Sequence, residues 1–330
     1  MRKDNAGSKF MLVMLVWNII FILSLIVSLE VLQEISGFDS GVLLSSPWFQ
    51  IFYQLTVFML PLAIWTLIRR EPLKPSLPAQ KLGSKNIIII VALGFLLQPM
   101  MMMISGISAL FFNNDVAAIM YTFQQQPFLL TLITVAVTPA VCEELVFRGY
   151  IQSKYRECTI RKAALINGLF FAIMHLNLQQ FAYTFVLGII FAYMVHHTRS
   201  IWAAIIPHFI VNATQATMAR LVLAAGTPQY PDLAAEELLA ALPVSQEALA
   251  IIVMGIIALF LSPVIVILFM EFFKHNRERN AEMDYEASLL PTDQPTPTYV
   301  PGREQASIID PYTIAVIALF ILFIALTIAS

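Results

Sequence analysis

The sequence Val141-Cys-Glu-Glu-Leu-Val-Phe-Arg-Gly-Tyr150 closes an apolar run that begins at Pro127. It places two adjacent carboxylates, Glu143 and Glu144, and one guanidinium, Arg148, in a segment long enough to cross a membrane. Ionisable side chains at membrane depth are costly, so this stretch is a candidate functional site. The function of these three side chains depends on which other side chains the fold places beside them.

The composition predicts an integral membrane protein. Of the 330 residues, 59% are hydrophobic and only 12% are charged, whereas a soluble domain carries about 25% charged residues. The first apolar run, Phe10–Leu29, follows basic residues as a signal peptide would. It is longer than a signal-peptide core and no small-residue cleavage site follows, so we expect it to be a retained helix.

Nine apolar segments are predicted to be helices. They are Phe10–Leu29, Trp48–Ile68, Ile87–Phe112, Pro127–Phe147, Ala163–Leu176, Phe181–Val195, Ile201–Leu223, Leu249–Phe273 and Ile308–Ala329. The fifth and sixth are short, and they form either two short spans or one broken hairpin. If the N-terminus is cytoplasmic and every segment crosses, all 19 lysines and arginines except Arg220 fall on the inner side, as the positive-inside rule expects. The predicted fold class is therefore all-α, a polytopic transmembrane helical bundle of about eight or nine membrane helices with a cytoplasmic N-terminus.

Three regions are expected along the chain. Residues 1–126 form N-terminal membrane helices, 127–225 a catalytic membrane core, and 226–330 C-terminal helices. Four prolines between 284 and 307 predict a flexible cytoplasmic linker before the last helix. The two cysteines, Cys142 and Cys158, lie in different surroundings and are expected to be inert thiols without a disulfide.

Polar side chains in three other places share a depth with the two glutamates. A rise of about 1.5 Å per helical residue from the nearest basic residues places Glu143 roughly 8 to 17 Å deep, His175 about 20 Å, His208 about 14 Å and Asn212 about 20 Å. In a hydrocarbon layer ~30 Å thick, these groups fall in one layer on the cytoplasmic side of the midplane. We therefore expect them to surround one site that opens toward the basic, cytoplasmic side.

Residue spacing gives these side chains directions. His208 and Asn212 are four residues apart and share one helix face, and both can donate hydrogen bonds to a single point. Phe171 and His175 have the same spacing, so the phenyl ring can pack against the imidazole ring.

The two glutamates are expected to differ. Glu144 and Arg148 have the spacing of an intrahelical ion pair, whereas Glu143 points about 100° away and stays available for chemistry. Pro139 and Pro207 each remove a backbone hydrogen bond beside a candidate residue, which membrane helices tolerate where protein or water supplies a new partner. A packing kink explains both prolines equally well.

These motifs resemble a known family. Glu-Glu-x-x-x-Arg at 143–148, Phe-x-x-x-His at 171–175 and His-x-x-x-Asn at 208–212 resemble the CPBP family of CAAX prenyl-proteases and bacteriocin-processing enzymes, also called type II CAAX endopeptidases or Abi proteins. The resemblance covers about residues 127–215. Each motif alone is weak, but three in order on successive predicted membrane helices are specific.

The resemblance implies a glutamate-dependent intramembrane endopeptidase without metal or other cofactor. It implies that Glu143 is the general base, that His175 helps it activate water, and that His208 and Asn212 form the oxyanion hole. The residues it assigns to catalysis are Glu143, His175, His208 and Asn212, and those it assigns to support are Glu144, Arg148 and Phe171.

Other functions compete with this one. A zinc-dependent membrane protease could use Glu143, Glu144, His175 and His208 as ligands. A non-catalytic immunity or scaffold protein could use the same groups to hold helices together, since a lone intramembrane His or Asn is often a helix-to-helix partner. A transporter could use a carboxylate as a proton relay.

The expected partners are the lipid bilayer and a peptide or membrane-protein substrate, lipidated or not, cleaved near the cytoplasmic face. No nucleic-acid partner is expected. The expected location is a bacterial cell membrane.

Overall fold

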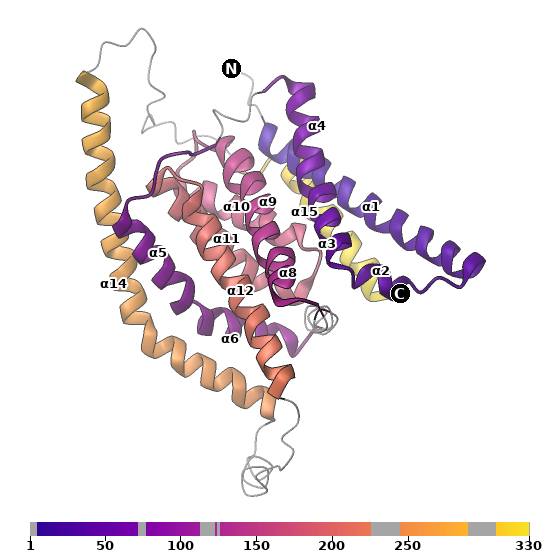
Figure 1. Cartoon of the computed structure of the whole chain (residues 1–330). Coiled ribbons are helices and arrows are strands. Elements are labelled where there is room, and N and C mark those ends of the chain that lie inside the picture. Colours follow the sequence, from indigo (N-terminus) through magenta and orange to yellow (C-terminus); the bar gives the residue numbers. More distant parts are fainter. Residues whose placement is uncertain are drawn as a thin grey trace, which may run out of the picture.

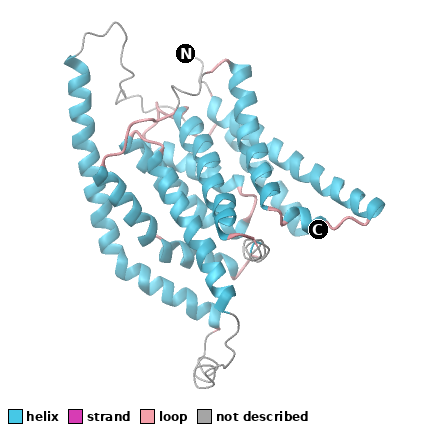
Figure 2. Ribbon diagram, in the orientation of Figure 1, coloured by secondary structure: helices cyan, strands magenta, loops and turns pink. Residues whose placement is uncertain are grey.

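The described part of the chain is all-α (Figures 1 and 2). A computed structural model describes residues 5–71, 77–112, 123, 126–225, 245–289 and 308–329. The elements, with η marking π-helical turns, are α1 Ala6–Ser36, α2 Ser40–Leu44, α3 Pro47–Gln54, η1 Leu55–Met59, α4 Leu60–Arg69, α5 Ser84–Leu96, α6 Gln98–Ala109, α8 Phe128–Leu132, η3 Ile133–Val137, α9 Thr138–Glu144, η4 Leu145–Ile151, α10 Ile160–Met174, α11 Leu178–Thr198, α12 Trp202–Ala225, α14 Gln246–Leu289 and α15 Pro311–Ala329.

Each of the nine predicted apolar segments is helical over most of its length. Seven helices in the described residues are long and apolar enough to cross a membrane: Ala6–Ser36, Pro47–Arg69, Ser84–Ala109, Phe128–Ile151, Leu178–Thr198, Gln246–Tyr285 and Pro311–Ile328. Helices α10 and α12 are outside this set, and α10 has only 15 residues. The chain is a multi-pass membrane protein, and the cytoplasmic position of its N-terminus stays a prediction.

The predicted linker at 284–307 is wrong at its start. Helix α14 continues to Leu289, because no proline lies between Asp284 and Pro291. Arg199 also holds this part of α14 through two hydrogen bonds to Asp284, of 2.7 and 2.8 Å. Residues 290–307, the rest of the predicted linker, lie outside the described residues.

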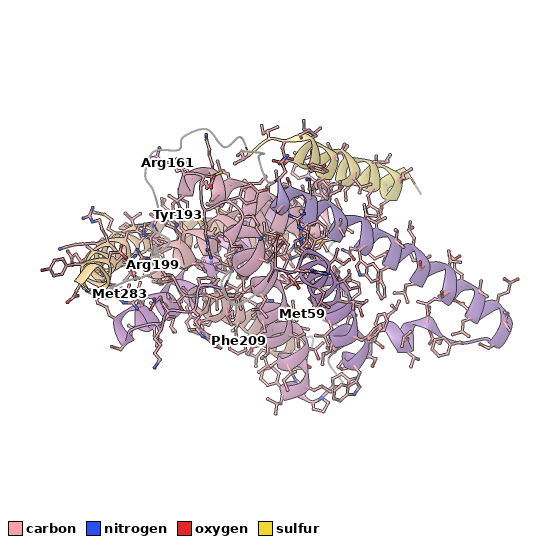
Figure 3. All side chains as sticks on the ribbon, turned by 90° about the horizontal axis from the view of Figure 1, so that it is seen from above. Met59, Arg161, Tyr193, Arg199, Phe209 and Met283 are labelled. Atoms are coloured by element: carbon pink, nitrogen blue, oxygen red, sulfur yellow. The ribbon has the colours of Figure 1, made fainter. Side chains whose placement is uncertain are left out.

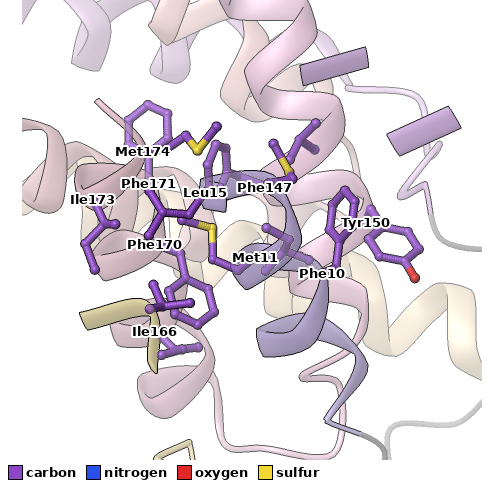
Figure 4. Packing of buried hydrophobic residues seen from close by; sticks show 14 of the residues in the cluster. Phe10, Met11, Leu15, Phe147, Tyr150, Ile166, Phe170, Phe171, Ile173 and Met174 are labelled. Atoms are coloured by element: carbon purple, nitrogen blue, oxygen red, sulfur yellow. The ribbon is translucent and has the colours of Figure 1, made fainter. Parts of the chain in front are cut away.

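Two apolar clusters hold the helices together. The first joins α1, η4, α10 and α15 and includes Phe10, Phe147, Phe170 and Phe320 (Figure 4). The second joins α5, α6, α11, α12 and α14 around residues such as Phe191. Because lipid is as apolar as these side chains, close packing rather than transfer from water stabilises such helix contacts.

Helices α10 and α11 pack against each other through two glycines. A Cβ at Gly188 would lie 2.6 Å from the Gly168 Cα, so both positions must lack a side chain for this approach. The turn between the helices reverses at Leu176, whose φ is 50°. Asn177 then begins α11 by accepting a 3.1 Å hydrogen bond from the Gln180 N–H. The two short predicted segments are thus separate helices joined by a tight turn.

The two ends of the bundle differ in charge. At one end, here called the basic end, α4 ends at Arg69, η4 leads to α10, and α11 turns into α12 at Arg199. The backbone closes this end, since the Ile201 N–H donates to the Pro78 carbonyl at 2.7 Å. At the other end, here called the distal end, α1 turns into α2, α10 turns into α11, and α12 ends. Every candidate residue lies between these two ends.

Candidate active site

The Glu-Glu-x-x-x-Arg stretch lies where an ordinary helix becomes a π-helix. Helix α9 ends at Glu144, and η4 begins at Leu145 and carries Arg148. A second π-helical turn, η3, precedes α9, and Pro139 is in the first turn of α9. Such π-helical turns are rare and often mark functional sites. They change the direction of the side chains that follow, which uniform helix spacing does not capture.

Glu144 and Arg148 form the buried ion pair that their spacing predicted. The Arg148 Nη1 donates to the Glu144 Oε1 at 2.9 Å, and the Nη2 donates to the Gly188 carbonyl at 3.2 Å. The relative exposure of Glu144 is 0% and that of Arg148 is 1%. The guanidinium also lies over the Phe171 ring, 4.4 Å from its centroid, and 5.4 Å from that of Phe191. We call these five residues the ion-pair floor.

His208 joins the floor to the second glutamate. Its Nδ1 is 2.7 Å from the Glu144 Oε1, the same oxygen that accepts from Arg148. A carboxylate held by a guanidinium accepts hydrogen bonds, so we assign the proton to Nδ1. The His208 Nε2 then faces the Glu143 Oε2 at 4.0 Å. One histidine thus contacts both carboxylates through different nitrogens.

Glu143 has much looser contacts than its neighbour. Its Oε1 accepts a hydrogen bond of 3.4 Å from the Gln54 Nε2, and its Oε2 has no hydrogen-bond partner among the described residues. Glu143 also lines a cavity of about 460 Å³, within the range of about 300 to 1,000 Å³ typical of ligand pockets. Glu143 therefore borders the cavity, whereas Glu144 does not.

His175 lines the same cavity from the end of α10. It is the C-cap of α10, one residue past the last helical residue. Its Nδ1 is 2.8 Å from the Phe171 carbonyl, which can only accept, so Nδ1 carries the proton and Nε2 is left as an acceptor. The Phe171 ring meets the His175 ring edge to face at 4.9 Å, as the spacing predicted.

Asn212 is held beside the cavity by a hydrogen bond to the Val135 carbonyl, which cannot accept a hydrogen bond from Pro139. Pro139 has no N–H to donate to the Val135 carbonyl four residues earlier. The Asn212 Nδ2 donates to that carbonyl at 3.1 Å. Protein therefore supplies a partner for this carbonyl, which is one of the possibilities that the sequence left open at Pro139. The same contact fixes the Asn212 amide beside the cavity, where one of its two N–H groups stays available.

The structure brings most of the predicted site residues into one place. Glu143, Phe171, His175, His208 and Asn212 all line the cavity. Glu144 and Arg148 do not line it, and they are linked to it through the contact of Glu144 with His208.

Sequence reasoning missed the contribution of α3. Gln50, Tyr53 and Gln54 line the cavity, and the Tyr53 hydroxyl donates to the buried Asn18 Oδ1 of α1 at 3.1 Å. The missed signal was available, since Gln50 and Gln54 are four residues apart in the otherwise apolar segment Trp48–Ile68.

The predicted opening toward the basic, cytoplasmic side stays a prediction, and the lining of the cavity does not favour it. Lining residues beyond the candidate catalytic groups include Leu44, Phe49, Phe123, Gln180 and Gln215, all from the distal halves of their helices or from distal connections. The depth argument counted residues from the basic surface and did not consider which side is packed.

Neither a metal cluster nor a cysteine pair accompanies these groups in the described part of the chain. No set of three or more His, Cys, Asp or Glu side chains there is arranged to hold a metal ion. The four side chains of the zinc alternative are therefore not gathered as ligands. Cys142 and Cys158 are both buried.

Comparison with known proteins agrees with the motifs. Residues 125–214 match the Rce1-like family, described as type II CAAX prenyl endopeptidase Rce1-like. A protein of Bacillus subtilis (strain 168) named "Putative membrane peptidase YdiL" is 28% identical over 101 residues, which is 30% of this chain and 41% of that protein. The chain thus spans less than half the length of this relative. No solved structure matches the chain. All three motifs lie inside residues 125–214, the segment that matches the Rce1-like type II CAAX prenyl endopeptidase family.

Proposed function

We propose that this protein is an intramembrane endopeptidase that uses Glu143 to activate water, without a metal ion. The observation that carries the proposal is the contrast between neighbouring carboxylates. Glu144 is held by Arg148 and His208, whereas Glu143 lines the cavity and accepts one hydrogen bond of 3.4 Å, from the Gln54 Nε2. An acceptor of this kind, beside an imidazole, suits general-base catalysis.

In the first step, Glu143 takes a proton from water while the water oxygen attacks the peptide carbonyl carbon. The His175 Nε2, left as an acceptor by the contact of Nδ1 with the Phe171 carbonyl, orients the same water. Glu143 then gives its proton to the leaving amine nitrogen as the carbon–nitrogen bond breaks. A positioned general base of this kind contributes roughly 10²- to 10⁴-fold to a rate.

Asn212 and His208 would stabilise the negative oxygen of the tetrahedral intermediate. Asn212 has a second amide N–H beyond the one given to Val135. His208 donates through Nε2 only when both ring nitrogens carry protons, because Nδ1 already donates to Glu144. Fixed donors of this kind, in a site shielded from water, stabilise developing charge strongly.

The ion-pair floor would act indirectly in this mechanism. Arg148 fixes Glu144, and Glu144 fixes the orientation of His208. Glu144 and Arg148 are thus positioning residues, and Phe171 contributes the carbonyl that orients His175. We also propose 127–225 as the catalytic core, completed by Gln54 and other α3 residues.

The substrate class would be a peptide or a membrane protein, with or without a lipid group. The test compares the protein termini present in membranes of cells with the wild-type chain and with Glu143→Gln or Glu143→Ala. We expect the same termini to disappear in both variants. The matched control is Glu30→Gln, the same change at an exposed glutamate of α1, which should keep every terminus.

Two other outcomes would support the competing functions. If no terminus differs and the cellular phenotype survives Glu143→Ala, a non-catalytic immunity or scaffold role replaces the enzyme. If a chelator removes all cleavage and zinc restores it, the reaction is metal-dependent and the role of Glu143 as a metal-free base is lost.

A further inference from the structure

We propose that the substrate reaches Glu143 from the distal end of the bundle, as an uncharged peptide segment that enters away from the basic loops. This inference rests on the proposed endopeptidase function. It concerns the route to the site and the chemistry of what fits there, and neither the motifs nor the family match assigns these.

The walls of the cavity run in one direction from the two glutamates. Helix α3 contributes its first residues, such as Gln50, and α11 contributes its first turns at Gln180 and Tyr183. Helix α12 contributes Gln215, which follows Asn212 toward the distal end. All these positions lie on the distal side of Glu143.

The basic side of the site is closed by packing. Between Glu143 and the basic end lie Arg148, Phe147, Tyr150 and Ile151, whose relative exposures are 1% or less. Thr198, at the turn from α11 to α12, is also fully buried. A peptide coming from the basic end would have to displace the ion-pair floor, which would unpair a buried Arg–Glu pair at a cost of several kcal/mol. Entry from the distal end requires no such change.

The cavity lining disfavours charged side chains on the substrate. Among the described residues that line it, Glu143 is the only carboxylate, and none is a lysine, arginine or aspartate. The polar members are mostly amides and hydroxyls, such as Gln50, Gln180 and Gln215, which can pair with backbone N–H and C=O groups. A charged substrate side chain would lose its hydration here without a compensating partner. The segment around the scissile bond is therefore uncharged.

The difference in charge between the two ends of the bundle indicates the side of the membrane from which the substrate enters. Basic residues are retained on the cytoplasmic side, and the described ones gather at the end opposite the cavity walls, with Arg220 as an exception. Arg220 donates to the Gln126 carbonyl at 2.8 Å, so it is held by protein at the distal end. Entry is thus from the non-cytoplasmic side.

The test uses single cysteines in a chain whose buried native cysteines carry Cys142→Ala and Cys158→Ala. Gln50→Cys on α3 and Gln215→Cys on α12 report on the cavity from independent helices. Gln80→Cys, at an exposed position beside Arg199, reports on the basic end. A sulfonated methanethiosulfonate, which does not cross membranes, is added to sealed vesicles of each orientation. We expect the cavity cysteines to react about tenfold faster or more from the face opposite to that which labels Gln80→Cys.

Labelling of the cavity cysteines from the same face as Gln80→Cys, from both faces equally, or from neither would overturn the route. The labelling is repeated with Glu143→Gln present, so it stays readable even if the chain cleaves nothing. Where cleaved termini are found, modified Gln50→Cys should lower their formation about tenfold or more, while modified Gln80→Cys should not. Unchanged formation with the cavity cysteine modified also contradicts the proposal.

Discussion

The ion-pair floor and the cavity wall differ in how tightly they hold a carboxylate, although Glu144 and Glu143 are adjacent in the chain. In the floor, one Glu144 oxygen accepts from both Arg148 and His208, and the guanidinium also donates to Gly188. At the wall, Glu143 has one hydrogen bond of 3.4 Å. Adjacent acids can therefore have separate tasks, one orienting and one reacting, according to the helix each of them faces.

The largest expected effect comes from breaking the floor. Arg148→Met removes the partner of a fully buried carboxylate, and losing one member of a buried pair costs about 3 to 5 kcal/mol. Unfolding of the purified protein in detergent, followed by heat or denaturant, measures this loss. Glu143→Gln is the matched change at the wall, where we expect unfolding to shift little while cleavage stops. Equal destabilisation by the two variants would remove the distinction between floor and wall.

A second test separates the chemical role of Asn212 from its structural role. Asn212→Leu removes the proposed oxyanion donor, so cleavage should fall about 10²- to 10³-fold. It also leaves the Val135 carbonyl without its donor, which should cost about 1 to 3 kcal/mol.

Adding Pro139→Ala to this variant returns a backbone N–H to that carbonyl. The double variant should therefore recover stability and not activity, as measured by unfolding and by cleavage rate. Recovery of both together would show that Asn212 only holds the helix.

A third test concerns the glycine contact that supplies a carbonyl to the floor. Gly188→Ala would place a Cβ 2.6 Å from Gly168, and overpacking of this kind costs about 1 to 3 kcal/mol. The change should separate α10 from α11 and weaken the hydrogen bond from Arg148. Gly83→Ala is the control, because a Cβ there would meet nothing within 4 Å. An unfolding midpoint that moves equally in both variants would count against the tight contact.

The smallest effect is expected at the basic end, where Glu71 offers an exposed counterpart to the floor. Burial acts to raise the pKa of Glu71, but hydrogen bonds from Lys154 and Tyr150 outweigh it and hold the pKa below its usual value. A depressed pKa means that the stabilisation is present at neutral pH and is lost as the pH falls through the folded-state pKa.

Because Glu71 is largely exposed, the contribution should be below about 1 kcal/mol. Glu71→Gln should make acid-side stability slightly less dependent on pH. Unfolding curves at several pH values measure this change, and an unchanged pH dependence would refute it.

Much of the fold, and part of the arrangement of the site, can be predicted from hydrophobic periodicity and from the free-energy cost of burying polar groups in a membrane. Long apolar runs become helices because a membrane leaves the backbone no other way to satisfy its polar groups. The pairing of Glu144 with Arg148 follows from spacing alone, and the shared layer of Glu143, His175 and His208 follows from counting residues from charged ends.

The remainder depends on departures from uniform helices and on contacts distant in sequence. Spacing rules assume a constant twist, so they did not anticipate η3 or η4, or the contact of Asn212 with Val135. Gln54 was not predicted, because burying an amide in an apolar run costs less free energy than burying a carboxylate and is therefore a weaker indication of function. The direction of the cavity depends on which side chains fill the space between helices, and depth estimates contain no information about packing.

A hydrogen bond between Ser8 and Asp310 joins two segments that are synthesised at different times. Asp310 begins α15 by accepting from the N–H groups of Tyr312 and Thr313, and it accepts a 2.6 Å hydrogen bond from the Ser8 hydroxyl, 302 residues earlier. Helix α15 lies along α1 (Figures 1 and 3) and adds Phe320 to the cluster around Phe10.

At roughly 5 to 20 residues per second, a ribosome needs roughly 15 to 60 s to make the chain between these two contacts. During that time the face of α1 that later receives α15 must be covered by lipid or by an insertion factor. The packing of α15 on α1 therefore forms after translation of the segments that carry Glu143, His175 and His208.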